Sequence, residues 1–159
     1  MPLQHTFRHE AMATTFTIAV AGDDRRYARQ AAQAAFEELD RIEGRLSRYV
    51  ENSDISRIGR LKAGQVSVVH PDTFDCLRIA LRMQQTTDGA FDVAYASRNP
   101  SESGPSFRLD AENHAVEVLT DGIVLGLGGI GKGFALDRIA ELLRDWEIES
   151  VLLAASTST

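Results

Sequence analysis

Residues 126–133 combine glycines with one lysine in a pattern suited to holding a phosphate group. They read G-L-G-G-I-G-K-G and follow an apolar run at 122–125. Apolar residues then recur at three- and four-residue spacing from Phe134 to Leu143, which predicts a helix. A strand, a glycine-rich turn and a helix in this order bring backbone N–H groups close to a phosphate. Glycine leaves room for that approach, and Lys132 adds a full positive charge.

One interpretation of this segment is a dinucleotide-binding fingerprint, because Gly126, Gly128 and Gly131 spell G-x-G-x-x-G. Such a site also requires an acidic residue after the next strand, which binds a ribose. That strand is expected at 150–153, and residues 154–156 read A-A-S without an acid. The glycine spacing therefore gives this interpretation only weak support.

A second interpretation is a P-loop, since Gly126, Gly131 and Lys132 fit G-x-x-x-x-G-K. A P-loop continues with Ser or Thr, whose hydroxyl holds magnesium, but Gly133 stands at that position. A third interpretation is a nucleotide site of another kind. A tight turn that packs a helix on a sheet would also account for the glycines, but not for Lys132.

Two carboxylates stand close together in a second segment, residues 87–92, which read T-D-G-A-F-D. Asp88 and Asp92 flank a turn that follows an expected helix at 72–85. They could bind a metal, hold a ribose or cap the turn. Short acidic side chains in turns often accept hydrogen bonds from backbone N–H groups, and this segment alone favours that structural role.

The composition is that of an ordinary soluble globular protein, with 43% apolar and 25% charged residues in 159. This length corresponds to one domain or to a large piece of one. The net charge of −6, without a basic stripe, argues against a nucleic-acid binder. Cys76 is the single cysteine, which excludes a disulfide within the chain and a cysteine-built metal site. Its apolar helical surroundings predict an inert core thiol.

Features of a membrane or export segment are missing from the sequence as written. No apolar stretch approaches the roughly 18 residues that span a bilayer. Residues 1–10 lack the charged start and apolar core of a signal peptide, and no N-terminal cysteine could carry a lipid anchor. The chain as written is therefore expected to be cytoplasmic.

The first half of the sequence predicts a strand followed by a long helix. Phe16, Ile18 and Val20 alternate with small residues, as in a half-buried strand. The helix is expected to run for about 25 residues. Its apolar face consists of Tyr27, Ala31, Ala34, Ala35, Leu39, Ile42, Leu46 and Tyr49.

Shorter elements are expected further along. Residues 52–54 should cap a short helix with Ile55 and Ile58 inward, followed by a strand at 65–69. The helix at 72–85 should end at a left-handed Gly89. The remaining expectations are a loop at 98–106 and a hairpin of 107–109 with 115–119. The class is therefore α+β, with a mixed or antiparallel sheet packed with two or three helices.

Motifs in four regions of the chain, in order, resemble those of one family. Residues 11–16, A-M-A-T-T-F, resemble its A-M-G-T-x-F strand. L-S-R-Y at 46–49 and S-D-I-S-R-I at 53–58 resemble its L-S-x-Y…S-E-I-S-R-I-N stretch. Residues 87–92 match its T-D-G-A-F-D, and 127–137 resemble its L-G-G-I-A-K-G-Y-A-x-D. The chain thus resembles the ApbE family, the FAD:protein FMN transferases, and an ApbE-like (T-fold-like) architecture is expected, incomplete at the C-terminus.

The resemblance implies a magnesium-dependent transfer that splits the diphosphate of FAD. Family members attach FMN through a phosphoester to a Thr or Ser of a target protein, often a subunit of a membrane redox pump. The implied cofactors are FAD, as substrate, and Mg²⁺. The residues that the resemblance places at the flavin nucleotide are Met12, Tyr49, Ala90, Phe91, Asp92, Gly126 and Lys132. Gly129 would offer its backbone carbonyl to the metal, and no catalytic residue is assigned.

The chain departs from the family pattern at several positions. Ala13 replaces a glycine, and Gly126 replaces an aspartate, so one flavin-site carboxylate is missing. Residues 154–159 read A-A-S-T-S-T in place of an A-G-G-D-like turn, and the segment after Asp92 is short. The resemblance implies that family members are longer than this chain by roughly another half. Their additional C-terminal part carries the acidic and threonine metal ligands.

Residues 1–159 are therefore expected to form the N-terminal portion of a single ApbE-like domain. Two functional classes remain open. In the first, the chain is part of a flavin transferase that acts with a C-terminal complement chain or as a homodimer. In the second, it is a degenerate module that binds a flavin nucleotide or a protein partner without transfer. The expected partners are FAD and a target protein with an acceptor Thr or Ser, without nucleic acid; the family is often exported and membrane-associated.

Overall fold

The computed structural model describes residues 3–97 and 105–156 of the chain. The loop expected at 98–106 lies mostly outside the described residues. The chain divides into two compact units, which are described separately. Unit 1 consists of Met1–Glu43 and Lys132–Thr159, and unit 2 consists of Gly44–Gly131.

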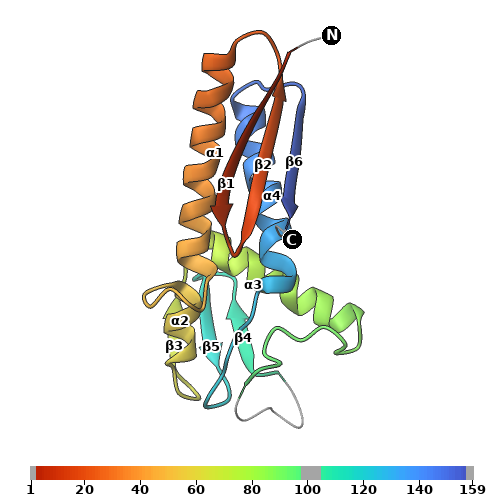
Figure 1. The fold of residues 1–159 in the computed structure, drawn as a ribbon. Coiled ribbons are helices and arrows are strands. Elements are labelled where there is room, and N and C mark those ends of the chain that lie inside the picture. Colours follow the sequence, from red (N-terminus) through yellow and green to blue (C-terminus); the bar gives the residue numbers. More distant parts are fainter. Residues whose placement is uncertain (1–2, 98–104, 157–159) are drawn as a thin grey trace. The chain divides into compact units, whose positions relative to one another are not determined.

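Unit 1 contains a three-stranded antiparallel sheet and most of two long helices (Figure 1). The strand order is β1-β2-β6, so β2 is central. The elements are β1 (Gln4–Ala11), β2 (Thr14–Ala21), β6 (Val151–Ser156), α1 (Arg25–Leu46) and α4 (Gly128–Asp145). The strand expected around Phe16, Ile18 and Val20 is confirmed as β2, and these three side chains are buried.

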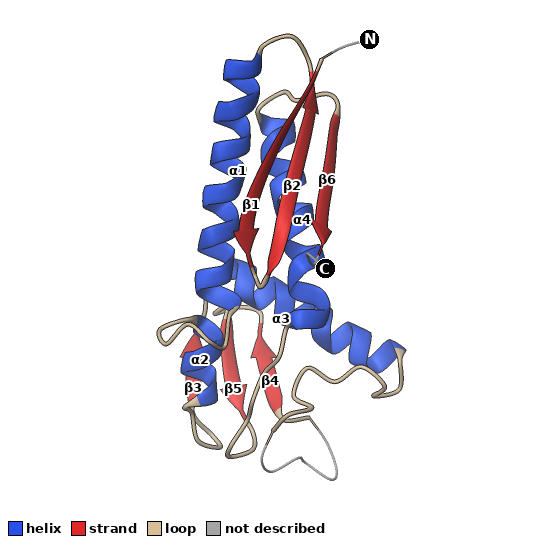
Figure 2. Ribbon diagram, in the orientation of Figure 1, coloured by secondary structure: helices blue, strands red, loops and turns tan. Residues whose placement is uncertain are grey.

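The core of unit 1 lies between this sheet and the helices. In Figures 1 and 2 α4 lies behind the strands, and α1 lies beside β1. His9 lies opposite Phe16 in the strand register and stacks on Phe36 of α1, with ring centroids 4.9 Å apart. Tyr27 of α1 donates a hydrogen bond to the carbonyl of Trp146, at 2.6 Å. On the other face of the sheet, Leu152 is 65% exposed.

Unit 2 contains a second antiparallel sheet, of order β3-β5-β4, and two helices (Figure 2). Its elements are α2 (Asp54–Gly59), β3 (Val66–Val68), α3 (Pro71–Thr86), β4 (Phe107–Asp110) and β5 (Ala115–Val118). The predicted hairpin and the α+β class are confirmed. The described residues form four helices, one of them only six residues long, and the strands divide into two sheets. No helix among the described residues is long and apolar enough to cross a membrane.

The long helix ends earlier than the apolar pattern predicted. α1 covers 22 residues and stops at Leu46, so Tyr49 is not part of its apolar face and is 83% exposed. The reason is local. Ser47 and Ser53 hydroxyls bond to backbone groups of the following loop, and such bonds compete with helical ones.

The strand predicted at 122–125 is not formed. Ile123, Leu125 and Leu127 are buried, so the alternation of apolar residues reports real burial. However, this segment joins neither of the two sheets in the described part of the chain. The Gly126 N–H donates to the Val93 carbonyl at 2.8 Å, and the Val124 N–H donates to a side-chain oxygen, at 3.0 Å. The segment is therefore a buried extended connection rather than a strand.

Helix α3 ends in a Schellman motif. The N–H of Gly89 bonds to the Gln84 carbonyl at 2.9 Å, and that of Asp88 bonds to the Gln85 carbonyl at 3.3 Å. Asp88, with φ of 50°, holds the position where glycine is usual, and Gly89 follows with φ of 83°. The left-handed end expected at Gly89 is confirmed and begins one residue earlier.

Cys76 is a buried core thiol, as predicted. Burial, with smaller contributions from the Asp72 and Asp75 carboxylates, raises the pKa of the Cys76 thiol from 9.0 to about 12. The unfolded chain therefore loses this proton at a lower pH than the folded chain. The free energy of unfolding has its full value below pH 9.0 and falls as the pH rises towards 12. We expect a thiol-specific disulfide reagent at pH 8 to react roughly a thousandfold more slowly with the folded chain than with the urea-unfolded chain. Equal rates would contradict this burial.

The turn between β1 and β2 places two non-glycine residues in the left-handed region. Met12 has φ of 53° and Ala13 has φ of 58°, as a two-residue type I′ hairpin turn requires. Asn and Gly are the usual residues in such turns, because other side chains are strained there. The chain therefore stores strain at this turn.

Ala13→Gly is expected to raise the free energy of unfolding by about 0.5–1 kcal/mol, because relief of the left-handed strain exceeds the added unfolded-state entropy. Thermal melting should show a rise of about 2–4 °C. Ala111→Gly is the matched control, since Ala111 lies in the other hairpin turn without positive φ. Ala111→Gly should lower the melting temperature. A lower melting temperature for Ala13→Gly would contradict the strain.

Candidate functional site

The glycine segment is the first part of a helix rather than a loop. Helix α4 begins at Gly128, and its first turn is closed by the Leu127 carbonyl. That carbonyl accepts the N–H of Ile130 at 3.0 Å and of Gly131 at 2.6 Å. In a helix with this start, the N–H groups of Gly128 and Gly129 have no carbonyl of their own helix to bond. Both residues are exposed, so a ligand can reach them.

Most of these glycines are not required by the fold. None of the glycines at 126–133, all of them within the described part of the chain, has positive φ. A Cβ atom added at Gly126, Gly128 or Gly133 would meet nothing within 4 Å. At Gly129 it would lie 3.2 Å from Cε2 of Phe91. Tight packing therefore explains Gly129, whereas Gly126, Gly128 and Gly133 leave open space beside the backbone.

Phe91 and Gly129, both predicted site residues, lie together in unit 2. Thr87 fixes the backbone of Phe91, because its Oγ1 accepts the Phe91 N–H at 3.0 Å and lies 2.8 Å from the Met83 carbonyl. The Gly126 N–H bond to Val93 joins the same two segments. The structure thus brings two of the family-like motifs, 87–92 and 127–137, into contact.

The carboxylate of Asp92 has a structural partner. Its Oδ1 accepts the N–H of Ala94 at 2.9 Å, which supports the turn-capping role considered from the sequence. Asp92 and Ala90 are both exposed, so a ligand can still reach the second oxygen of Asp92.

Tyr49 presents its ring to solvent on the loop between α1 and α2. The Arg48 guanidinium lies over this ring, 5.0 Å from its centroid, and Nη2 donates to the Tyr49 hydroxyl at 2.8 Å. An exposed aromatic ring with one face covered by a cation is suited to stacking against a flat ring.

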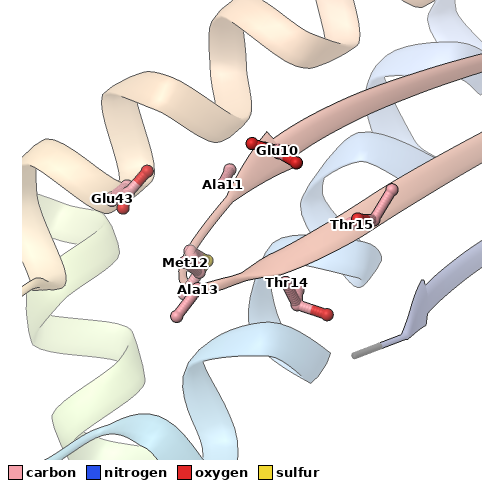
Figure 3. A pocket seen from close by; sticks show the side chains of 7 residues that line it. All are labelled: Glu10, Ala11, Met12, Ala13, Thr14, Thr15 and Glu43. Carbon is pink, nitrogen blue, oxygen red and sulfur yellow. The ribbon is translucent and has the colours of Figure 1, made fainter. Parts of the chain in front are cut away.

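In unit 1, Met12 lies at the tip of the β1–β2 turn, beside a cavity of about 390 Å³. Figure 3 shows Glu43 reaching from α1 towards this turn, with Glu10 at the end of β1. The lining residues are Glu10, Ala11, Met12, Ala13, Thr14, Thr15 and Glu43. Thr14 is 7% exposed, and its Oγ1 is the one buried side-chain oxygen or nitrogen of the described residues without a hydrogen-bond partner.

Lys132 belongs to unit 1 by its contacts and is half-buried in the second turn of α4. Met12 is the other predicted site residue of this unit. The remaining ones, Tyr49, Ala90, Phe91, Asp92, Gly126 and Gly129, belong to unit 2.

The described residues do not make a magnesium site by themselves. Among residues 3–97 and 105–156, no three His, Cys, Asp or Glu side chains gather as metal ligands. Gly129 offers one carbonyl, and at this place in a helix that oxygen also faces the N–H four residues on. Magnesium requires about six ordered oxygens, so one shared carbonyl is insufficient.

Several residues that shape the candidate site were not singled out from the sequence. They are Thr87, which holds Phe91, Ser56 of α2, and Thr14 and Glu43 at the turn. Ser53 was expected as part of a helix cap, which is confirmed by its acceptance of the Ser56 N–H at 3.0 Å. The S-x-x-S spacing at 53–56 was the available signal for Ser56.

Comparison with solved structures supports this fold. Flavin transferase ApbE from Vibrio cholerae matches with a TM-score of 0.83 and 17% identity, over 96% of this chain and 57% of that chain. The ApbE protein from Thermotoga maritima matches with a TM-score of 0.81 and 25% identity, again over 96% of this chain and 57% of that chain. The apo form of flavinyl transferase ApbE from Pseudomonas stutzeri matches with a TM-score of 0.83 and 18% identity, over 98% of this chain and 60% of that chain.

Comparison of sequences agrees. An FAD:protein FMN transferase of Buchnera aphidicola subsp. Schizaphis graminum (strain Sg) is 23% identical over 142 residues, covering 73% of this chain and 42% of the relative. The chain thus spans about half the length of the proteins it matches. The model of the ApbE family matches residues 12–100 and 101–158. Since that match covers nearly the whole chain, this protein belongs to the ApbE family.

Proposed function

We propose that this chain is the N-terminal portion of a single-domain FAD:protein FMN transferase. The observation that carries the proposal is the open space beside Gly126 and Gly128, next to a helix N-terminus. Neither backbone conformation nor packing requires glycine there, so the space is available to a ligand that must approach the backbone closely. The N–H groups and Lys132 favour an anionic ligand, as the diphosphate of FAD is.

The proposed reaction transfers the FMN half of FAD to a protein hydroxyl. The oxygen of an acceptor Thr or Ser attacks the phosphorus on the FMN side, and a phosphoester bond forms. The bond from that phosphorus to the bridging oxygen breaks, and AMP leaves with the oxygen. The hydroxyl proton passes to a base. We assign this role to none of the described residues. Positive charge and N–H donors around the diphosphate stabilise the charge that builds up on it.

The proposed site follows the family pattern. Met12, Tyr49, Ala90, Phe91 and Asp92 would line the flavin. Gly126 and Lys132 would lie at the diphosphate, and Gly129 would give its carbonyl to Mg²⁺. Because no three His, Cys, Asp or Glu side chains gather as metal ligands among the described residues, a C-terminal complement chain or a second copy would have to complete the metal site. The 159-residue chain alone is therefore proposed to have little transferase activity.

A second candidate is a module that binds a flavin nucleotide or a protein partner without transfer. Gly126 in place of the aspartate of the family favours it, since one carboxylate of the flavin site is lost.

Incubation of the chain together with a separately supplied C-terminal portion of an ApbE protein, FAD, Mg²⁺ and a peptide carrying an acceptor threonine separates the two functions. Covalent flavin fluorescence on the peptide, lost when EDTA is added, supports the transferase. Flavin binding without labelling supports the module. Rapid Mg²⁺-dependent release of FMN by this chain alone would contradict the proposed incompleteness of its metal site.

Gly128→Ala tests the use of the open space. Alanine favours the helix, and its Cβ meets no protein atom, so the melting temperature should stay the same or rise. The affinity for FAD should nevertheless fall by about 5- to 20-fold, because the Cβ occupies space that the ligand needs. Calorimetric titration with FAD measures this. Unchanged affinity in a stably folded variant would show that the ligand does not use this space.

A further inference from the structure

The loop at 47–53 is fastened by hydroxyl groups from the start of α2. The Ser53 hydroxyl donates to the Ser47 carbonyl at 2.5 Å and lies 3.0 Å from that of Ser56. The Ser56 hydroxyl lies 2.7 Å from the Val50 carbonyl and 3.0 Å from the Arg48 carbonyl, and its one proton is shared between them. These bonds surround Tyr49 on both sides in the sequence.

Further bonds complete the attachment of this loop. The Ser47 hydroxyl accepts the Tyr49 N–H at 3.2 Å. The guanidinium of Arg60, which follows α2, donates to the Glu51 carbonyl at 2.8 Å. A short loop with this many bonds to its own backbone loses little conformational entropy when it meets a ligand.

The loop exposes one large aromatic ring. Tyr49 is 83% exposed although its backbone is held on both sides, so the fold itself gains little from its burial. Arg48 covers one face of the ring and leaves the rest to solvent. Exposure of a ring on a rigid support is expected where the ring serves a ligand rather than the core.

We propose that Ser53 and Ser56 are positioning residues, whose hydroxyls fix the 47–53 loop so that the Tyr49 ring is held ready for the flat ring system of a flavin. This inference rests on the proposed function, in which Tyr49 lines the flavin site. It assigns a ligand-directed role to the S-x-x-S spacing of α2, beyond the capping of a helix.

The test is a double-mutant cycle for FAD binding by the 159-residue chain, with hydrogen exchange of the loop amides. Ser56→Ala should raise the Kd for FAD by about 3- to 10-fold and speed exchange at 47–53. Ser56→Thr, which keeps the hydroxyl, should restore most of the affinity. Ser67→Ala is the matched control, because Ser67 lies in β3 and its hydroxyl bonds to the Val68 carbonyl. It should leave both measurements unchanged.

The cycle separates positioning from general stabilisation. In a Tyr49→Ala background, Ser56→Ala should change the Kd by less than about 2-fold while lowering the melting temperature as before. Equal losses of affinity in both backgrounds, or slow exchange at 47–53 in Ser56→Ala, would overturn the inference alone. A chain that does not bind FAD, or binds it equally well as Tyr49→Ala, would instead contradict the proposed flavin site, and the inference with it.

Discussion

Asp54→Ala is expected to lower the free energy of unfolding of unit 2 by about 3 kcal/mol. Asp54 is 7% exposed, and its Oδ2 accepts the His70 N–H at 3.0 Å and the Thr73 hydroxyl at 2.6 Å. Its Oδ1 pairs with the Arg57 guanidinium. One carboxylate therefore joins the first turn of α2 to the N-terminus of α3, and its removal leaves the fully buried Thr73 hydroxyl without an acceptor.

Urea unfolding followed by circular dichroism measures this loss. Asp54→Asn should lose less than Asp54→Ala, because one oxygen remains to accept a hydrogen bond. Arg78→Ala breaks an exposed pair with Asp75 in the same unit and should lose at most about 0.5 kcal/mol. A loss for Asp54→Ala no larger than that of Arg78→Ala would contradict the structural role of this carboxylate.

Lys132→Ala is expected to weaken FAD binding by about 10- to 100-fold, the range for loss of a charge-assisted contact. Lys132 carries the only side-chain charge in residues 126–133, so nothing else in that segment can replace it. The loss should diminish as salt is added, because screening weakens the attraction to the diphosphate. Titration with FAD at low and high ionic strength measures both effects.

The chain offers a close control for this change. Lys62 is its other lysine and is exposed, so Lys62→Ala removes the same charge at a position without a proposed ligand. Lys62→Ala should bind FAD as the unaltered chain does, and Lys132→Arg should retain much of the affinity. Similar affinities for Lys132→Ala and Lys62→Ala would show that Lys132 does not meet the diphosphate.

Much of the fold could be predicted because periodicity and caps are local signals. β2, the Ser53 cap, α3 and the β4–β5 hairpin all follow from the spacing of apolar residues and from turn residues. β1 was not predicted, since Q-H-T-F-R-H-E-A lacks a run of β-branched residues. Its hydrogen bonds come from β2, and that pairing is visible only in three dimensions.

The end of α1 shows a limit of periodicity. Tyr49 continues the apolar spacing of the helix, yet the hydroxyls of Ser47, Ser53 and Ser56 draw the backbone into a loop. The spacing of apolar side chains contains no information about hydroxyl groups that compete for the backbone hydrogen bonds of a helix. The prediction that Tyr49 lies on the apolar face of this helix was therefore wrong, whereas its place in the flavin site is part of the proposed function.

The glycine segment shows the opposite case. A glycine-rich turn was expected before the helix, but from Gly128 on the segment is the start of α4 itself. A helix that begins at Gly128 still offers free N–H groups, and the open space at Gly126 and Gly128 became evident only from the coordinates.

Calorimetric titration of the 159-residue chain with FAD and, separately, with riboflavin tests the central claim most directly. If the glycines and Lys132 hold the diphosphate while Tyr49 and Phe91 meet the flavin, FAD should bind saturably with one site and at least about 10-fold more tightly than riboflavin. Failure of FAD to bind, or equal affinity for FAD and riboflavin, would contradict the account.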